Sequence, residues 1–328
     1  MNPVRNSISG NRITHPRIKH GLKEKTTANI LSNGVKIVAC IPARFSSTRF
    51  PGKVLAKDTG KFLIQHVYEQ ACQAKLIDRV IIAADDRRVV EAAKSFGAEC
   101  VLTSVKHQSG TDRIAEAVKN VDADIVVNLQ ADEPEIDPDN IDYVARLLAD
   151  NPDYPMATLA APFDNAKQIA DPNIVKVVVS SCVPSTALGT GVRDASCEKK
   201  EMDSRFRGND STQYARRNTQ DDIGRAIYFS RSPIPYDREK AGIGKLEQYL
   251  RHIGIYAYRK EFLLKITALP QTPLEKIEKL EQLRALENGF SILVGRVKHT
   301  CDGIDTPEQY AEFVKRYKKS HRRHRGET

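Results

Sequence analysis

Three basic residues cluster in one short segment of the sequence, "ACIPARFSSTRFPGKVL", which spans 39–55. Arg44, Arg49 and Lys53 are interspersed there with small polar residues and Gly52. Small residues let backbone N–H groups approach an anion, and two cations on one loop can hold a polyphosphate from two sides. The segment lacks the spacing of a Walker A loop and the pattern G-x-G-x-x-G. It indicates either a polyphosphate clamp formed by Arg44 and Lys53 or an ordinary solvated basic loop.

Carboxylates follow a second apolar run, in "VVNLQADEPEIDP" at 126–138. Asp132 and Glu133 stand where this expected strand ends, and Mg²⁺ usually takes one or two such carboxylates together with substrate phosphates. The alternative is a polar turn with helix-capping acids, but the abrupt end of so apolar a strand favours the metal. A third segment, "CDGIDTPEQY", places Asp302 and Asp305 between a strand and a helix. Sequence spacing does not decide whether Asp305 is a second metal ligand or a residue that merely precedes a helix cap.

Alternating strands and helices must position these loops in the first half of the chain. The expected strands are 36–42, 79–85, 98–103 and 124–130. The expected helices are 61–75, 87–97, 109–121 and 138–150. This alternation predicts an α/β fold with a parallel sheet covered on both faces. Ligands bind at the carboxyl ends of strands in such sheets, where the basic loop and the first carboxylates lie.

The second half of the chain is more mixed. Its expected strands are 156–163, 173–180, 226–231, 252–258 and 291–299. Helical spacing predicts one helix over 273–289 that ends at Gly289, with an inward stripe of Ile277, Leu280, Leu283 and Leu286. A last helix is expected to begin after Thr306 as its cap.

Residues 181–223 show neither helical nor strand periodicity. They are rich in small polar residues and carry seven basic and seven acidic side chains. A structureless stretch of this length inside a compact domain is typically a functional lid or a disordered insertion. We favour an insertion, because the flanking strands resemble two arms of one hairpin.

The net charge of +9 is concentrated at the two ends of the chain. Residues 1–34 carry +5 and residues 315–328 carry +6, which leaves −2 for the remainder. Basic ends can adhere weakly to RNA, but charge runs are usually solvated and disordered. The chain is therefore not expected to be a basic nucleic-acid platform. No apolar run approaches the roughly 18–20 residues that cross a bilayer, no secretory signal is present, and the six scattered cysteines indicate reduced thiols in a cytoplasmic protein.

Seven motifs in a fixed order give a more specific indication. They are "IPARFSSTRFPGKVL", "HQSGTDR", "NLQADEP", "FSRSPIPYDR", "LRHIGIYAYR", "PLEKIEKLEQLRALENG" and "GIDTPEQ". Together they resemble the 3-deoxy-manno-octulosonate (KDO) cytidylyltransferase family, from about Lys36 to Tyr317 without 181–223. The resemblance implies Mg²⁺-dependent transfer of CMP from CTP to KDO for lipopolysaccharide synthesis. It also implies a homodimer with a nucleotide-diphospho-sugar-transferase-like α/β/α sandwich and a mostly parallel sheet. One catalytic domain would span 35–319, between a basic N-terminal extension (1–34) and a basic tail (320–328).

The same motifs assign roles on the nucleotide side. Arg44 and Lys53 would hold the CTP phosphates and act in catalysis. Asp132 and Asp305 would be catalytic as ligands of Mg²⁺. Residues near the nucleotide would be Ser109, Gly110 and Gln130.

The sugar pocket is implied by the later motifs. It would contain His252, Tyr256, Glu281 and Gln282, and Arg113 would meet an anionic group of either substrate. Without the resemblance, His252 in its apolar strand is more readily interpreted as a core histidine.

Three departures from the family pattern bear on activity. Ala131 replaces the glycine that precedes the first aspartate, and a methyl group costs about 1 kcal/mol if that position needs a positive φ. Ala84 stands where a threonine is common, and 181–223 interrupts a hairpin. A cytidylyltransferase for another acidic sugar, such as sialic acid, and an insertion-inactivated nucleotide- or RNA-binding relative are the alternatives.

Overall fold

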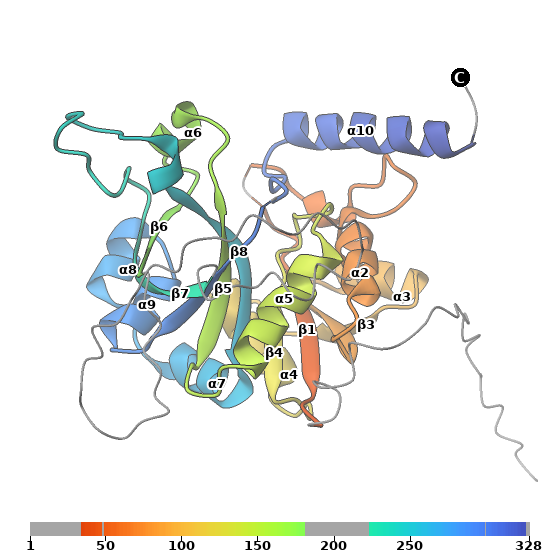
Figure 1. Ribbon diagram of the computed structural model, residues 1–328. Helices are drawn as coiled ribbons and strands as arrows, with labels where there is room; N and C mark the ends of the chain where they lie inside the picture. The colour runs from red at the N-terminus through yellow and green to blue at the C-terminus, as the bar shows by residue number, and fades with distance from the viewer. Residues whose placement is uncertain (1–33, 48, 181–222, 299, 326–328) are drawn as a thin grey trace, which may run out of the picture.

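The computed structural model describes residues 34–47, 49–180, 223–298 and 300–325 (Figure 1). Its first four strands are parallel neighbours in the order β3-β2-β1-β4. They are β1 (Ile37–Ala43), β2 (Arg79–Ala84), β3 (Glu99–Leu102) and β4 (Ile125–Asn128). Each is followed by a helix, namely α2 (Leu63–Gln73), α3 (Arg87–Ser95), α4 (Gly110–Val118) and α5 (Pro138–Ala149). The expected alternation of this half is confirmed.

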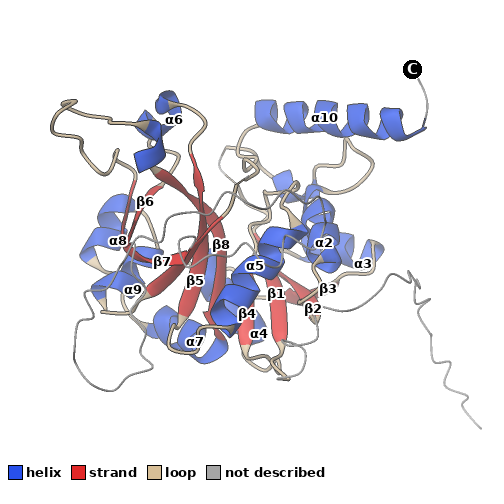
Figure 2. Cartoon of the chain, viewed as in Figure 1, coloured by secondary structure: helices blue, strands red, loops and turns tan. Residues whose placement is uncertain are grey.

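Burial on both faces explains why β1, β2 and β4 read as continuous apolar runs, whereas the edge strand β3 is only partly buried. In β1, Ile37, Ala39 and Ile41 belong to one hydrophobic cluster, whereas Val38 and Cys40 belong to the other. Helices α2, α3 and α5 pack on the first cluster and α4 packs on the second. Figure 2 shows the strands as a central layer between helices. The expected α/β/α layering is therefore present.

The whole sheet is mixed, so the expectation of a mostly parallel sheet is confirmed for β1 to β4 but does not hold for the second half of the chain. The remaining strands are β5 (Met156–Pro162), β6 (Lys176–Ser180), β7 (Ile223–Ser230), β8 (Leu250–Arg259) and β9 (Ile292–Arg296). The order of the nine strands is β3-β2-β1-β4-β8-β5-β9-β7-β6. Strand β8 runs antiparallel to its neighbours β4 and β5, and a further pairing of Lys176 with Arg251 joins β6 to β8. Periodicity locates strands, but their direction depends on long-range connections that periodicity does not contain.

The hairpin expected around the insertion is confirmed. Strands β6 and β7 pair antiparallel, and the pairing begins at Ser180 opposite Arg225. The expected insertion at 181–223 lies outside the described residues except for its last residue, Ile223, which begins β7.

The helix expected over 273–289 is two short helices. They are α8 (Pro273–Glu278) and α9 (Gln282–Glu287), and Lys279 between them has φ 54°, in the left-handed region. Because the chain turns there, Ile277 is 76% exposed and the prediction that it faces inward is wrong. Leu280 and Leu283 are buried as expected. Two helices had no sequence signal that we recognised, α6 (Ala166–Ala170) and α7 (Lys260–Ala268).

The last helix, α10 (Pro307–Arg325), begins as expected, with the Gln309 N–H donating to Thr306 Oγ1 at 3.3 Å. It continues into the segment expected to be the basic tail, 320–328, because residues as far as Arg325 are helical. Figure 1 shows it lying across the loop that follows β1 and the helix α2. Across the part of the chain that the structure describes, no helix is both long and apolar enough to cross a membrane.

Candidate active site

Lys53 lies between the two carboxylates expected to bind metal. Its Nζ donates to Asp132 Oδ2 at 2.7 Å, to the Ile304 carbonyl at 2.8 Å and to Asp305 Oδ1 at 3.2 Å. Arg49, which had no assigned role, pairs with Asp305 Oδ2 at 2.9 Å. The loop after β1, the loop after β4 and the segment before α10 therefore meet at one point.

A left-handed turn presents Lys53 to these carboxylates. Gly52 has φ 69°, a conformation that glycine adopts without steric cost, and its N–H donates to the Phe45 carbonyl at 3.1 Å. Lys53 then opens the short 3₁₀ helix η1 (Lys53–Leu55). The residue is only 9% exposed, so its stem is held by packing while Nζ reaches the carboxylates.

Helix α10 holds the same loop from the other side. The Tyr310 hydroxyl accepts the Asp58 N–H at 2.9 Å, and the Tyr310 ring lies 5.6 Å from that of Phe50. Tyr310 is buried with Leu63 and Ile304. The loop that carries Lys53 and the segment that carries Asp305 are thus packed against one another.

The oxygens around Lys53 fit a divalent cation. Asp132 Oδ2 and Asp305 Oδ1 lie within 3.2 Å of Lys53 Nζ. The two carboxylates therefore converge on a space that the Lys53 ammonium group occupies. Hard oxygen ligands of this kind suit Mg²⁺, which keeps water or phosphate in its other positions. Within the described residues, no group of three or more His, Cys, Asp or Glu side chains is placed to hold a metal. Asp132 and Asp305 would thus need phosphate or water to complete a coordination shell.

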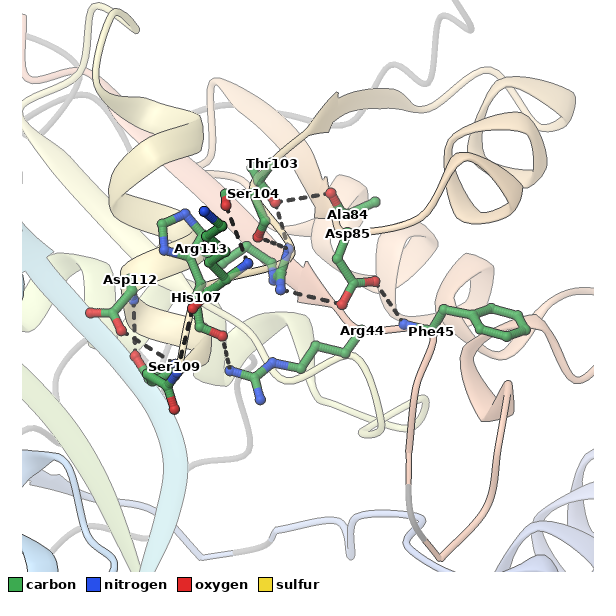
Figure 3. Close-up of polar contacts among 12 residues, drawn as sticks. Arg44, Phe45, Ala84, Asp85, Thr103, Ser104, His107, Ser109, Asp112 and Arg113 are labelled. Atoms are coloured by element: carbon green, nitrogen blue, oxygen red, sulfur yellow. Dashed lines mark hydrogen bonds and ion pairs between the residues drawn. The ribbon is translucent and has the colours of Figure 1, made fainter.

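Arg44 directly follows β1 and reaches the loop that precedes α4 (Figure 3). Its Nη2 donates to the His107 carbonyl at 3.3 Å. The next residue is fixed by Asp85, whose Oδ1 accepts the Phe45 N–H at 2.9 Å. Asp85 Oδ2 accepts from Arg113 Nη2 at 3.3 Å. These contacts place Arg44 at the carboxyl ends of β1 and β2.

Arg113 is buried and is not open to a substrate anion. Its Nη1 donates to Thr103 Oγ1 at 2.6 Å and to the Ser104 carbonyl at 3.3 Å, and the residue is 0% exposed. Burial lowers the pKa of its guanidinium, and Asp85 opposes that effect. This environment favours a positioning role for Arg113 over direct contact with a substrate.

The first turn of α4 lies against the end of β1. Ser109 Oγ accepts the Asp112 N–H at 3.0 Å while Asp112 Oδ2 accepts the Ser109 N–H at 3.3 Å, which confirms the expected capping box. A Cβ on Gly110 would lie 3.3 Å from Pro42 Cγ, so glycine permits this close approach. Ser109 and Gly110 therefore lie near the end of β1 that leads into the Arg44 loop.

The residues expected on the sugar side begin at the same turn. Thr111 Oγ1 donates to Glu281 Oε2 at 2.5 Å, which connects α4 to the start of α9. Burial raises the pKa of Glu281. Gln282 is 6% exposed, and its Nε2 has no hydrogen-bond partner among the described residues. Both side chains line a cavity of about 20 Å³ with Thr111 and Tyr258.

His252 and Tyr256 stand on one strand, β8, with their rings 5.3 Å apart. The Thr158 hydroxyl donates to the Ile255 carbonyl at 2.7 Å, so at the 2.9 Å contact His252 Nε2 is the donor to Thr158. Burial lowers the pKa of His252 to about 3 and raises that of Tyr256, so both are neutral at pH 7. His252 is thus a half-buried, neutral histidine whose Nε2 is hydrogen-bonded within the sheet.

Gln130 and Glu133 lie between the carboxylates and β8. Gln130 Nε2 donates to the Gly254 carbonyl at 3.1 Å. Burial, and then the neighbouring Asp132, raise the pKa of Glu133 to about 8. Glu133 borders a cavity of about 180 Å³ together with Glu135, Ile136, Asp137, Asn140, Ile253, Ile255, Thr300 and Cys301. No pattern in the sequence indicated this cavity.

The two alanine departures are accommodated. Ala131 is buried and is not among the positive-φ residues, so its methyl group causes no left-handed strain. Ala84 is buried in the core and contributes its carbonyl, which accepts from Thr103 N–H at 2.8 Å and Thr103 Oγ1 at 2.9 Å.

This fold, with its converging cations and carboxylates at the ends of parallel strands, matches known nucleotide-transferring proteins. Residues 38–190 and 193–293 match the cytidylyltransferase family. A "3-deoxy-manno-octulosonate cytidylyltransferase" of Solibacter usitatus is 43% identical over 87% of this chain and 96% of its own. The protein of that name from Syntrophotalea carbinolica is 42% identical over 84% and 95%.

A solved structure gives the same assignment. It is a "CMP:2-keto-3-deoxy-manno-octonic acid synthetase" complexed with CTP, 37% identical, with a TM-score of 0.69 over 87% of this chain and 99% of its own. A 4-diphosphocytidyl-2C-methyl-D-erythritol synthase from Anaerococcus prevotii, 12% identical with a TM-score of 0.51, shares the fold. The chain belongs to the cytidylyltransferases and, within them, to the 3-deoxy-manno-octulosonate cytidylyltransferase family.

Proposed function

We propose that the protein transfers CMP from CTP to KDO and releases pyrophosphate. The observation that carries this proposal is the convergence of Lys53, Asp132 and Asp305 beside the Arg44 loop. The names of the relatives and the CTP complex of the related synthetase support the same reaction. The product would serve lipopolysaccharide synthesis.

In the proposed reaction, the anomeric hydroxyl of KDO attacks the α-phosphorus of CTP in line. A new oxygen–phosphorus bond forms, the bond to the β-phosphate breaks, and the hydroxyl proton leaves to solvent. Positioning and charge limit such an attack on a polyanion, and no covalent enzyme intermediate is required. Arg44 and Lys53 carry positive charge that would stabilise the departing pyrophosphate.

Mg²⁺ is part of the proposal. Asp132 and Asp305 would hold it, because their oxygens already converge on the Lys53 ammonium group. The bound ion would neutralise phosphate charge and activate the attacking hydroxyl. With the metal bound, Lys53 would exchange its carboxylate partners for phosphate oxygens. A homodimer, which the resemblance implies, and a cytoplasmic location, which the scattered cysteines indicate, belong to the same proposal.

Neutral hydrogen-bonding groups would select the sugar. His252 and Tyr256 remain uncharged at pH 7, and Gln282 has a free donor. Glu281, with its raised pKa, can exchange its Thr111 contact for a sugar hydroxyl. Such groups would suit the hydroxyls of a polyhydroxylated acid.

Pyrophosphate release by the full chain, with CTP, KDO and Mg²⁺, tests the proposal. We expect release with KDO, little with N-acetylneuraminate and none without Mg²⁺. Faster turnover of N-acetylneuraminate would favour the alternative function, a cytidylyltransferase for another acidic sugar such as sialic acid. If there is no release, but RNA binding is present and vanishes on deletion of 1–34 and 320–328, the proposed function is wrong.

A further inference from the structure

Glu116, on the second turn of α4, fixes the segment 103–107 at two points. Its Oε2 accepts the Ser104 N–H at 3.0 Å and pairs with His107 Nε2. The hydrogen bond from Ser104, followed by that from His107, lowers the pKa of Glu116. The carbonyl of the same His107 accepts Arg44 Nη2 at 3.3 Å. One carboxylate on α4 thus holds both ends of the segment that contacts Arg44.

Arg113 supports the segment 103–107 from the same side of α4, since residues three apart share a helix face. It donates to Thr103 Oγ1 and the Ser104 carbonyl. Its contact with Asp85 extends the support to the residue after Arg44, because Asp85 accepts the Phe45 N–H. Figure 3 shows these side chains converging between α4 and the ends of the strands.

We propose that Glu116 is a positioning residue for Arg44, with Arg113 as a second support. This inference rests on the proposed function, in which Arg44 binds the phosphates of CTP. An arginine held in its binding orientation before the ligand arrives loses less side-chain freedom on binding. Glu116 provides that restraint indirectly, by fixing the His107 carbonyl that Arg44 contacts. It does not touch the nucleotide, so it is not a catalytic residue.

A double-mutant cycle on CTP binding isolates this role. The Kd for CTP is measured by calorimetry for the full chain, for Glu116→Ala, for Arg44→Ala and for the double variant. We expect Glu116→Ala to weaken binding about tenfold when Arg44 is present. In the Arg44→Ala background the same change should weaken binding less than about twofold, because the residue through which Glu116 acts is gone.

Equal losses in the two backgrounds, or no loss in either, overturn the inference. The Glu116 side chain is 41% exposed, so its removal leaves no buried cavity that would unfold the chain. Glu116→Gln retains an acceptor for the Ser104 N–H and should recover part of the affinity. Glu91→Ala, at an exposed position of α3, is the matched control and should leave Kd unchanged.

The cycle is read from binding, so it is separate from turnover. A wild-type chain that binds CTP with the expected coupling but releases no pyrophosphate would contradict the proposed function and leave this inference intact. A wild type that releases pyrophosphate, but in which the losses of CTP affinity from Glu116→Ala and Arg44→Ala simply add, would support the proposed function and overturn this inference. In the active enzyme, Glu116→Ala should raise KM for CTP and leave KM for KDO unchanged.

Discussion

Lys53 and Arg284 are both cations with little exposed surface that face carboxylates, yet they are held differently. Arg284 Nε and Nη2 donate to the two oxygens of Glu275 at 2.8 and 2.5 Å, and the side chains are 8% and 3% exposed. The Lys53 side chain is 11% exposed, but the side chains of its partners Asp132 and Asp305 are 27% and 43% exposed. The Arg284–Glu275 pair is closed to solvent, whereas the carboxylates of the Lys53 cluster remain open to it.

This is the difference expected between a structural ion pair and a cluster that can exchange its partners for a ligand. In a bidentate arginine–carboxylate pair, two directional N–H donors are used by both carboxylate oxygens, which leaves no room for a ligand between them. An ammonium group is a point charge, so Lys53 can exchange a carboxylate for a phosphate with little rearrangement. Charged residue types alone do not distinguish the two cases, because burial and the number of partners decide them.

The largest effect is expected from breaking the open cluster. Asp132→Asn removes a charge from the proposed metal site and preserves the side-chain shape. We expect kcat for pyrophosphate release to fall about 10³-fold, equivalent to about 4 kcal/mol of transition-state stabilisation. Asp302→Asn is the matched control: Asp302 is 77% exposed and pairs with Arg251, so kcat should change less than about threefold. Near-normal kcat for Asp132→Asn would remove this carboxylate from the mechanism.

Breaking the closed pair should affect stability first. Glu275→Gln leaves the Arg284 charge buried without its counter-ion, and we expect the free energy of unfolding in urea to fall by about 3 kcal/mol. The comparison is Glu69→Gln, because Glu69 and Lys61 form a pair in which each side chain is 38% exposed. That change should cost about 0.5 kcal/mol or less. Equal effects of the two substitutions would mean that the Arg284 pair is not closed in solution.

The fold was predictable where local pattern and tertiary environment agree. The strands β1, β2 and β4 are buried on both faces, so their apolar runs and intervening helices could be located from sequence. The direction of β8 and its place between β4 and β5 could not, because pairing partners that are far apart in the sequence leave no mark on periodicity. The resemblance supplied the fold family but not the mixed pairing of this half.

His252 extends the comparison to a half-buried titratable group without a charged partner. Its folded pKa of about 3 lies below the ordinary value of 6.5, so the unfolded chain binds the proton first as the pH falls. Its contribution to stability is complete above pH 6.5 and is lost as the pH falls toward 3. Between pH 7 and pH 5 the loss should be about 2 kcal/mol.

The His252→Gln variant isolates this contribution. Unfolding in urea at pH 7 and pH 5 gives the pH-dependent loss of each protein, and the wild type should lose about 2 kcal/mol more than the variant. The same loss in both would show that His252 is accessible to protons in the folded state. That result would weaken the contrast with the Lys53 cluster.

Residues that bind a substrate are easier to predict from motifs than residues that hold them in place. Lys53, Asp132 and Asp305 were expected together and do converge. Arg49 and Glu116 were missed, because their contacts with Asp305 and with Ser104 exist only in the folded chain. Helix spacing carried a weak signal for Glu116, which shares a face with Arg113.

The smallest effect is expected at Ile277, where helical periodicity predicts burial and the structure shows 76% exposure. Ile277→Ser should change the free energy of unfolding by about 0.5 kcal/mol or less. Leu283→Ala, on the buried side of α9, should cost about 2–5 kcal/mol.

Similar costs at the two positions would show that Ile277 is covered in solution. If the destabilisation by Ile277→Ser then grows with protein concentration, a second copy of the chain supplies the cover, because mass action stabilises an assembled state. If it does not depend on concentration, the left-handed break at Lys279 is absent and 273–289 forms the single helix that its periodicity predicts.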